Sequence, residues 1–481
     1  MAEKKSFYIT STLPYVNAEP HIGFAMEIIQ ADIVARWKKL LGFDIFFNTG
    51  TDEHGQKVFN AAQKEGKDPQ AYTDELAEKF KSLQKLPGLS EDLHFIRTTE
   101  ERHKKAAQEI WKRCLDAGYI DKKQYKIKYC VGCELEKTDS ELVGGKCLIH
   151  PDKELEIHEE ENYFFKFSEF GPKLLELYDE KKLKVTPDDR LNEIRALIGR
   201  GLEDFSISRL KKKLSWGVPV PNDPEHVMYV WFDALVSYIS TLGWPDDTEN
   251  FEKFWINGTP TQFAGKDQVR QQAAMWQAIL MAAGLPPTKE IVIHGFLNFE
   301  GQKMSKSLGN VISPREIVDE FGLEALRYFV AREFNQFEDT DVGMEKLREA
   351  YNANLANGLG NLVSRIMKMA ETNLSQAPEI PEESIPQDFK DALNNFEIGK
   401  ATEIIWRKIG ELDKRVQETE PYKLVKTDPE KAKQIISELA VELYTVGRML
   451  NPIMPETNVK IKALVKANKA PEQPLFPRKD A

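Results

Sequence analysis

The sequence has 481 residues, of which 41% are hydrophobic and 30% charged, with 28 glycines and 25 prolines. This composition is ordinary for a globular protein and excludes the collagen-like, disordered and disulfide-scaffold classes. At about 150 residues per domain, the length predicts roughly three folding units. With 66 basic and 77 acidic residues the net charge is −11, which excludes binding to nucleic acid through overall charge. A nucleic-acid partner would need local basic patches, such as residues 211–213 or 460–469, and solvated surface explains each of these equally well.

No targeting or membrane segment is expected. Residues 1–6 lead directly into a strand-like segment, without the apolar core or cleavage site of a signal peptide. The most apolar stretch, residues 227–244, is interrupted by Asp233, Ser237 and Ser240, so it is unsuited to cross a bilayer. A cytoplasmic location without a membrane partner is therefore predicted.

The first 50 residues predict a βαβ unit. Residues 7–12 are typical of a buried strand, apolar residues at helical spacing favour a helix from about His21 to Leu41, and residues 44–48 resume a strand. Units of this kind form parallel sheets that bind ligands at the carboxyl ends of the strands. His21 and Gly23 occupy the place expected to meet a phosphate.

The rest of the chain predicts an interrupted sheet domain followed by helices. Residues 119–221 show short strand-like pieces and charged loops, typical of an insertion, and strand alternation returns at residues 227–232. A helix from about Gln268 and a strand at residues 291–293 complete the sheet. From Met344 onward apolar residues at helical spacing, among them Leu362, Ile366, Ile405 and Leu439, predict an all-α bundle, with a loop over residues 376–388.

Two short segments suggest chemistry on a nucleotide. In Pro20-His21-Ile22-Gly23-Phe24 an imidazole at a helix start can donate to a phosphate oxygen, although such a short segment alone is more often a turn with a satisfied histidine. Residues 301–310, GQKMSKSLGN, hold Lys303 and Lys306 between glycines, so the ammonium groups can meet charge that develops on a triphosphate. For an arbitrary pair of lysines a solvated loop would be the better interpretation, but this string is far more specific.

Three of the four cysteines predict a metal site. Cys130, Cys133, Cys147 and His150 form two pairs, each separated by two residues, which is the spacing of a structural zinc site with no open coordination position. Unligated buried cysteines are the weaker alternative, because Gly132, Gly144 and Gly145 make this region rich in turns.

These motifs, in this order, resemble the methionyl-tRNA synthetase family of class I aminoacyl-tRNA synthetases. The two signatures are PHIGF and KMSKS, and further segments match the family's pattern along essentially the whole chain: LPYVNAEPHIG, NTGTDEHG, the cysteine-bearing insert, YVWFDAL, FAGKD, HGF, LRYF and NLVSR. The resemblance implies a split Rossmann-type α/β catalytic domain with a zinc-containing insertion, followed by a helical bundle. Its parts would be residues 1–118 and 223–300 for the two catalytic halves, 119–222 for the insertion, 301–345 for the KMSKS loop and stem-contact region, and 346–481 for the anticodon-binding domain.

The resemblance also implies an activity, which is the ATP-dependent formation of methionyl-adenylate and its transfer to the 3′-terminal ribose of tRNA, for initiation and elongation. Methionine, ATP with Mg²⁺, structural Zn²⁺ and the methionine tRNAs are the implied ligands. Because the family's C-terminal extension with an oligonucleotide-binding domain is missing here, a monomer is expected.

Roles for individual residues follow from the same resemblance. His21, Lys303 and Lys306 would be catalytic, and ATP would be bound by His21, Gly23, Phe24, Lys303, Ser305 and Lys306. Methionine would be bound by Leu13, Tyr15, Asp52, Trp231, Ala234, Tyr238 and Gln272. Anticodon bases would be contacted by Asn361, Arg365 and Tyr422. Without the family, Asp52 could equally cap the next helix, Trp231 and Tyr238 would be core aromatics, and Asn361 and Arg365 would be polar residues on a helix face.

Three positions depart from the family's pattern. Phe24 replaces the second signature histidine, Gln272 replaces a pocket histidine, and Gln268 stands where an apolar residue is usual. Two rival hypotheses follow. The first, motivated by Gln268 and Gln272, is a class I synthetase for another amino acid. The second, motivated by Phe24, is a non-catalytic paralogue that binds tRNA or methionine.

Overall fold

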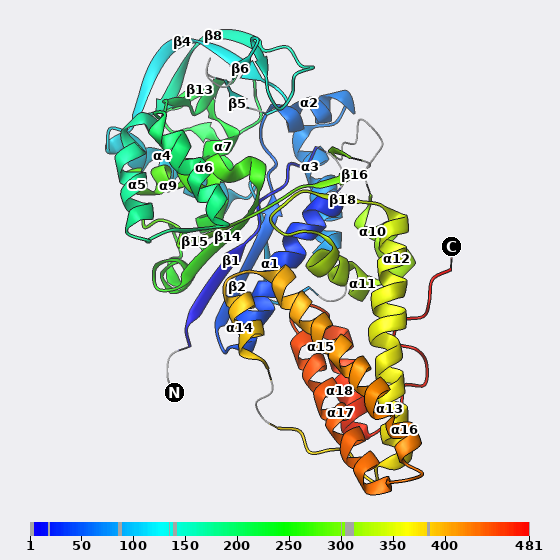
Figure 1. Ribbon diagram of the computed structural model, residues 1–481. Helices are drawn as coiled ribbons and strands as arrows, with labels where there is room; N and C mark the ends of the chain where they lie inside the picture. The colour runs from blue at the N-terminus through cyan, green and yellow to red at the C-terminus, as the bar shows by residue number, and fades with distance from the viewer. Residues whose placement is uncertain are drawn as a thin grey trace. The chain divides into compact units, whose positions relative to one another are not determined.

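A computed structural model describes residues 4–17, 20–84, 89–133, 135–137, 142–299, 301–303, 312–381 and 385–480. The chain forms two compact units (Figure 1). The first contains Met1–Pro20, Gly42–Lys85 and Glu91–Ile293, and the second contains His21–Leu41, Leu86–Ser90 and His294–Ala481. No helix of the described part of the chain is long and apolar enough to cross a membrane.

The first unit is built on a six-stranded sheet in the order β3-β2-β1-β14-β15-β9. Its strands are β1 (Ser6–Thr10), β2 (Asp44–Thr51), β3 (Leu93–Arg97), β9 (Lys184–Thr186), β14 (Thr259–Gly265) and β15 (Glu290–His294). β1 pairs in parallel with β2 and β14, as do β2 with β3 and β15 with β9. Some 250 residues separate β1 from β14, and Phe7 lies opposite Thr259. The predicted α/β class with a split parallel sheet is confirmed.

The strand order reverses at β1, which lies between β2 and β14. In open parallel sheets the ligand binds beyond the carboxyl ends of the strands at such a reversal. The segments that leave these ends are residues 11–17 after β1, residues 52–55 after β2 and residues 266–272 after β14. These segments hold four of the residues predicted to bind methionine: Leu13, Tyr15, Asp52 and Gln272.

The insertion consists mainly of a long antiparallel ribbon. β4 (Ile120–Cys130) pairs with β8 (Glu156–Phe165) along its length, whereas only short strand pieces were expected. The ribbon is hard to detect from sequence because its positions are largely polar, and Lys122, Gln124, Lys126 and Lys128 are exposed. β5 (Leu135–Glu136) and β10 (Phe205–Ser206) extend this sheet, and β6 (Leu142–Val143) pairs with β7 (Lys146–Cys147).

The helices of the first unit are α2 (Gln56–Lys64), α3 (Pro69–Gln84), α4 (Glu101–Asp116), α5 (Gly171–Asp179), α6 (Asp188–Gly199), α7 (Val230–Ala234), α8 (Ser237–Ser240) and α9 (Trp276–Ala282). The expected strand at residues 227–232 is wrong in its second half. β13 (Asp223–Met228) pairs with β11 (Ser208–Leu210) and β12 (Pro219–Val220), and Val230 begins a helix. α7 is buried on all sides, so its sequence carries neither a strand nor a helix period.

The second unit is helical apart from a small sheet of β16 (Leu297–Phe299), β17 (Gln302–Lys303) and β18 (Thr340–Val342). Its helices are α1 (Ile22–Leu40), α10 (Pro314–Phe321), α11 (Leu323–Tyr328), α12 (Met344–Ala350), α13 (Asn361–Asn373), α14 (Gln387–Asn394), α15 (Ile398–Thr419), α16 (Pro421–Leu424), α17 (Pro429–Leu450) and α18 (Pro455–Ala467). Figure 1 shows α13, α15 and α17 running side by side. Predicted core positions such as Leu362, Ile366, Ile405 and Leu439 are fully buried, which confirms the helical C-terminal region.

Candidate active site

Asp52 and Tyr15 lie together in the first unit. The segment after β1 pairs with the end of β2, because Asp52 N donates to Pro14 O at 3.0 Å and Val16 N donates to Asp52 O at 3.2 Å. Asp52 is buried, with 2% of its surface exposed. It does not cap the next helix, since α2 begins after Gly55 without a side-chain cap. The backbone therefore pairs Asp52 with Tyr15, and the capping alternative is excluded.

Aromatic side chains from α7 and α8 complete this group. Trp231, Ala234 and Tyr238 follow at helical spacing, so they share one face. The Trp231 ring meets Tyr15 edge to face at 6.0 Å between centroids. Leu13 and Tyr15 are half-buried and pack against the core that contains Trp231 and Tyr238. The structure thus brings the Tyr15 and Trp231 rings into contact and places Leu13 and Tyr238 at the same hydrophobic core.

Gln272 joins the same group through its amide. Its Nε2 donates to the Tyr238 hydroxyl at 2.7 Å, and its Oε1 accepts from Gln262 Nε2 at 3.2 Å. Gln272 is 1% exposed, and Thr288 and Gln277 extend the hydrogen-bond network behind it. The amide therefore sits in a fixed orientation at the position where the family usually has histidine.

Sequence reasoning missed the buried charged residues that follow Asp52 in the chain and the partners that these residues contact. Glu53 accepts from Arg97 at 2.7 and 2.9 Å, and His54 and His103 each contact Asp233 at 2.6 Å. Burial acts to raise the pKa of Asp233, but the attraction and hydrogen bonds of the two histidines outweigh it and hold the pKa at about 2. The partners are 179 and 130 residues apart in sequence, so no spacing pattern could have revealed them.

His21 is the N-cap of α1 in the second unit. Its Nδ1 accepts from Gly23 N at 3.0 Å, which in a neutral ring places the proton on Nε2. A Cβ at residue 23 would lie 2.9 Å from His21 Cε1, so glycine is needed for this close approach. His21 is exposed and Phe24 is buried. The first amides of the helix are already bonded, and Nε2–H is the group suited to donate to a phosphate.

The second signature is described only at its two ends. The backbone of Lys303 pairs with Asn298 in the β16–β17 hairpin, whereas Ser305 and Lys306 lie outside the described residues. Beyond them, Ile312 O accepts from Ile22 N, the first amide of α1, at 3.2 Å. The chain that leaves the KMSKS segment is therefore hydrogen-bonded beside His21, within the same unit.

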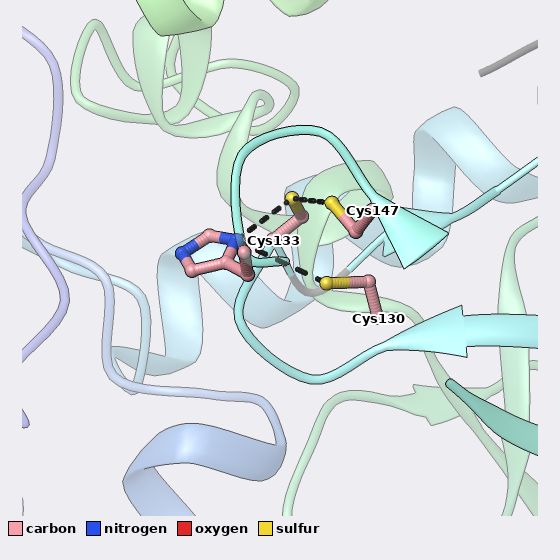
Figure 2. A group of neighbouring side chains, drawn as sticks. Cys130, Cys133 and Cys147 are labelled. Carbon is pink, nitrogen blue, oxygen red and sulfur yellow. Dashed lines mark hydrogen bonds between the residues drawn. The ribbon is translucent and has the colours of Figure 1, made fainter. Parts of the chain in front are cut away.

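The predicted metal ligands converge in the insertion. The ligand atoms of Cys130, Cys133, Cys147 and His150 all lie within 4.8 Å of one another, and the three sulfur atoms point together in Figure 2. Cys133 Sγ is 3.4 Å from Cys147 Sγ and 3.2 Å from His150 Nδ1. A tetrahedral zinc ion with Zn–S bonds of about 2.3 Å needs sulfurs separated by about 3.8 Å, which is close to this arrangement.

Two further observations favour a cation at this cluster. A Cβ at residue 132 would lie 2.4 Å from His150 Cγ, so glycine at this position lets the His150 ring pack close to the turn that carries Cys133. Burial raises the pKa of the Cys133 thiol, so a nearby cation would be needed to hold this side chain as a thiolate. The donor set, its geometry and its burial all fit Zn²⁺.

The predicted anticodon residues lie at one end of the helical bundle. Arg365 on α13 and Tyr422 on α16 line a cavity of about 490 Å³ together with Ser364, Lys368, Met369, Val416, Ala470 and Pro471. Arg365 is held by Asp413 on α15 at 2.7 Å, and the Tyr422 side chain is half exposed. Asn361 is exposed one helical turn before Arg365 and is not part of the cavity wall.

Known proteins share both the sequence and the fold. The chain matches the family described as "tRNA synthetases class I (M)" over residues 7–150 and 133–367. It is 40% identical to the methionine–tRNA ligase of Thermotoga maritima, over 97% of this chain and 76% of that protein. It is 38% identical to the methionine–tRNA ligase of Rickettsia felis, over 98% and 94%.

Solved structures with a similar fold belong to the same family as the sequence relatives. The Mycobacterium tuberculosis methionyl-tRNA synthetase in complex with methionyl-adenylate matches with a TM-score of 0.89 and 34% identity, over 98% of this chain and 100% of that one. The free form of that protein matches with a TM-score of 0.82 and 30% identity, over 100% and 99%. The chain therefore belongs to the methionyl-tRNA synthetase family of class I tRNA synthetases.

Proposed function

We propose that this chain activates methionine with ATP and transfers the methionyl group to the 3′-terminal ribose of its tRNA. The observation that carries the proposal is the hydrogen bond from Ile22 N to Ile312 O, at 3.2 Å. It joins the start of the helix that bears His21 to the end of the segment that bears Lys303 and Lys306. The imidazole of His21 and the ammonium groups of the two lysines are the kinds of group that stabilise the charge of a reacting triphosphate.

In the first step the methionine carboxylate attacks the α-phosphorus of ATP in line. A P–O bond forms to the carboxylate, the bond between the α- and β-phosphates breaks, and pyrophosphate leaves. His21 donates Nε2–H to a phosphate oxygen, and the ammonium groups of Lys303 and Lys306 meet the charge that accumulates on the departing pyrophosphate. ATP enters with Mg²⁺, as in other phosphoryl transfers. No protein nucleophile is required, because the enzyme supplies position and charge.

Methionine is held by charge at one end and by shape at the other. The buried Asp52 carboxylate pairs with the ammonium group, since a buried unpaired cation would cost several kcal/mol. Tyr15 and Trp231 contact the thioether side chain, each sulfur–aromatic contact contributing about 0.3–1.5 kcal/mol. Leu13, Ala234 and Tyr238 complete the pocket, and Gln272 orients the Tyr238 hydroxyl.

In the second step the terminal ribose hydroxyl of the tRNA attacks the carbonyl carbon of the adenylate. The new ester bond forms, AMP leaves, and the hydroxyl proton is lost. The far end of the tRNA is recognised by the bundle, where an anticodon base stacks on Tyr422 for about 1–3 kcal/mol. Arg365 and Asn361 donate to base edges. Both initiator and elongator methionine tRNAs are the proposed partners, a monomer is the proposed working form, and the cytoplasm, where translation occurs, is the expected location.

Zinc is proposed as a structural ion of the insertion. Cys130, Cys133, Cys147 and His150 would hold it, and with four protein ligands it supplies rigidity to the knuckle and no position for a reacting water.

ATP–pyrophosphate exchange tests the first step alone. Wild-type protein is expected to exchange only when methionine is present, and Lys306→Ala and His21→Ala are each expected to lower the exchange by about 10²–10³-fold. Lys433→Ala is the matched control, because this lysine pairs with Glu430 on the surface of the bundle at 2.8 Å. Exchange that is unchanged in Lys306→Ala contradicts the proposal. Absence of exchange in the wild type would instead support the non-catalytic rival.

A further inference from the structure

A buried carboxylate connects two parts of the methionine site. Asp233 is fully buried on α7, between Trp231 and Ala234 in sequence. Its Oδ2 is 2.6 Å from His54 Nδ1, and its Oδ1 is 2.6 Å from His103 Nε2. Both imidazoles are buried as well, with 2% and 0% of their surface exposed. The three side chains, here called the Asp233 hub, therefore form a closed hydrogen-bonded unit.

The hub has a defined direction of donation. A carboxylate accepts only, so His54 donates from Nδ1 and His103 donates from Nε2. The other ring nitrogen of His103, Nδ1, lies 3.0 Å from the Ser240 hydroxyl of α8 and accepts from it in the neutral ring. Each hydrogen bond thus fixes the orientation of one imidazole ring. Through these bonds the hub connects the segment after β2, which carries His54, with α7, α4 and α8.

The elements that the hub connects carry the predicted methionine ligands. His54 comes two residues after Asp52, and Asp233 comes two residues after Trp231. The residue between Asp52 and His54 is anchored separately, because Glu53 is clamped by Arg97 at 2.7 and 2.9 Å. The chain that carries Asp52 is therefore fixed on its C-terminal side by two side-chain contacts, Glu53 with Arg97 and His54 with Asp233, and the second of these leads to the helix that carries Trp231.

A buried anion of this kind is weak evidence for a role in stability. Replacement of a buried charged group and its partners by apolar residues of similar volume is often neutral or stabilising. What a hydrogen-bonded hub provides instead is a fixed geometry, and a misplacement of 1 Å at a reacting group can lower a rate by about 10²-fold. Packing alone would fill this space without specifying the distance from Asp52 to Trp231.

We propose that Asp233, acting through His54 and His103, is a positioning residue for methionine activation. It holds the ammonium-binding carboxylate of Asp52 and the pocket ring of Trp231 at one separation, so that both ends of methionine are gripped together. ATP binding does not depend on this separation. The inference rests on the proposed function, because it assumes that methionine is the amino acid held at this site.

The test compares KM values in ATP–pyrophosphate exchange. Asp233→Asn keeps the shape, but an amide can accept from one imidazole only and presents NH₂ to the other. We expect KM for methionine to rise about 10- to 100-fold, with KM for ATP within about twofold of wild type. Asp204→Asn is the matched control, because that carboxylate is hydrogen-bonded by Ser168 and Lys123 and lies outside the methionine group. It should leave both KM values unchanged.

A second pair of variants tests the proposal if Asp233→Asn does not fold. His103→Gln retains a neutral donor, whereas His103→Leu retains none, so KM for methionine should rise less in the first than in the second. The proposal is overturned if these variants melt earlier but keep KM for methionine within about twofold, or if both KM values rise equally. Lack of methionine-dependent exchange in the wild type would be a different result, because it would overturn the proposed function itself.

Discussion

Gln272 shows how a single residue can depart from a family pattern without loss of order. Its amide donates to Tyr238 and accepts from Gln262, and Gln262 accepts in turn from the Thr288 hydroxyl at 2.8 Å. An imidazole can change its charge near neutral pH, whereas an amide cannot. The polar contact to Tyr238 is therefore kept in a form that stays neutral at any working pH.

This network predicts the effect of changing Gln272. Gln272→Leu removes both hydrogen bonds and leaves buried polar partners, at about 1–3 kcal/mol each. KM for methionine should rise about 10- to 100-fold in ATP–pyrophosphate exchange. Gln272→His restores a donor for Tyr238 and should stay within about threefold of wild type. Full activity of Gln272→Leu would show that the amide does not order the pocket.

At the scale of elements, one buried arginine ties α1 to the bundle inside the second unit. Arg327 on α11 is 1% exposed and lies 2.7 Å from Asp32 on α1. It also donates to the carbonyl oxygens of Ile453 and Pro452 at 2.6 and 2.9 Å. The other contacts of Asp32 are Arg36 at 2.8 Å and Ser90 N at 2.7 Å. The position of the helix that begins at His21 therefore depends on this guanidinium.

Removing that tie should be costly. Arg327→Met leaves the Asp32 carboxylate buried without its main counter-charge. Breaking such a pair is expected to lower the free energy of unfolding by about 3–5 kcal/mol. The measurement is urea unfolding followed by circular dichroism. Arg348→Met, which breaks a partly exposed pair with Glu320 at 2.7 Å, is the control and should cost about 1 kcal/mol or less. If the two variants lost the same free energy of unfolding, the buried pair of Arg327 would be no more important for stability than the partly exposed pair of Arg348.

The proposed zinc site at Cys130, Cys133, Cys147 and His150 is a second feature that depends on few residues. The protein purified without chelator should contain about one zinc per chain by metal analysis, since four ligands close a structural site. Cys133→Ser should lose the metal, because it removes a thiolate from the cluster. Cys114→Ser is the control, because Cys114 is buried next to Ile279 and takes no part in the cluster. Equal zinc content in both variants would refute this site.

On the scale of the whole molecule, features set by neighbours in sequence were predictable and those set by distant partners were not. The periodicity of residues 22–41 predicted α1, the bundle core was predicted at Leu362 and Ile366, and the spacing of three cysteines and His150 predicted their cluster. The helix at Trp231 was mistaken for a strand because burial on all sides removes any period. Glu53, His54, His103 and Asp233 were missed because their partners meet only in the fold.

The residues proposed to bind methionine lie in the first unit, whereas the cavity lined by Arg365 and Tyr422 lies in the second, so methionine binding and the proposed recognition of the anticodon should be separable. Arg365→Ala and Tyr422→Ala should therefore leave ATP–pyrophosphate exchange within about twofold of wild type. Loss of base stacking should raise KM for tRNA in aminoacylation by about 10- to 100-fold. Lys368→Ala, in the same cavity wall, shows how much of the effect is charge alone. Equal loss of exchange and of charging would contradict separate roles.

Competition among amino acids tests the central claim most directly. Total tRNA is charged by the wild-type protein in an equimolar mixture of all twenty amino acids with ATP, and the amino acid released from the tRNA is identified by mass spectrometry. A pocket that selects by shape discriminates by only about 1–3 kcal/mol per methylene, so traces of close isosteres are tolerable. The account predicts that methionine dominates the released product. A different dominant amino acid, or uncharged tRNA, would contradict it.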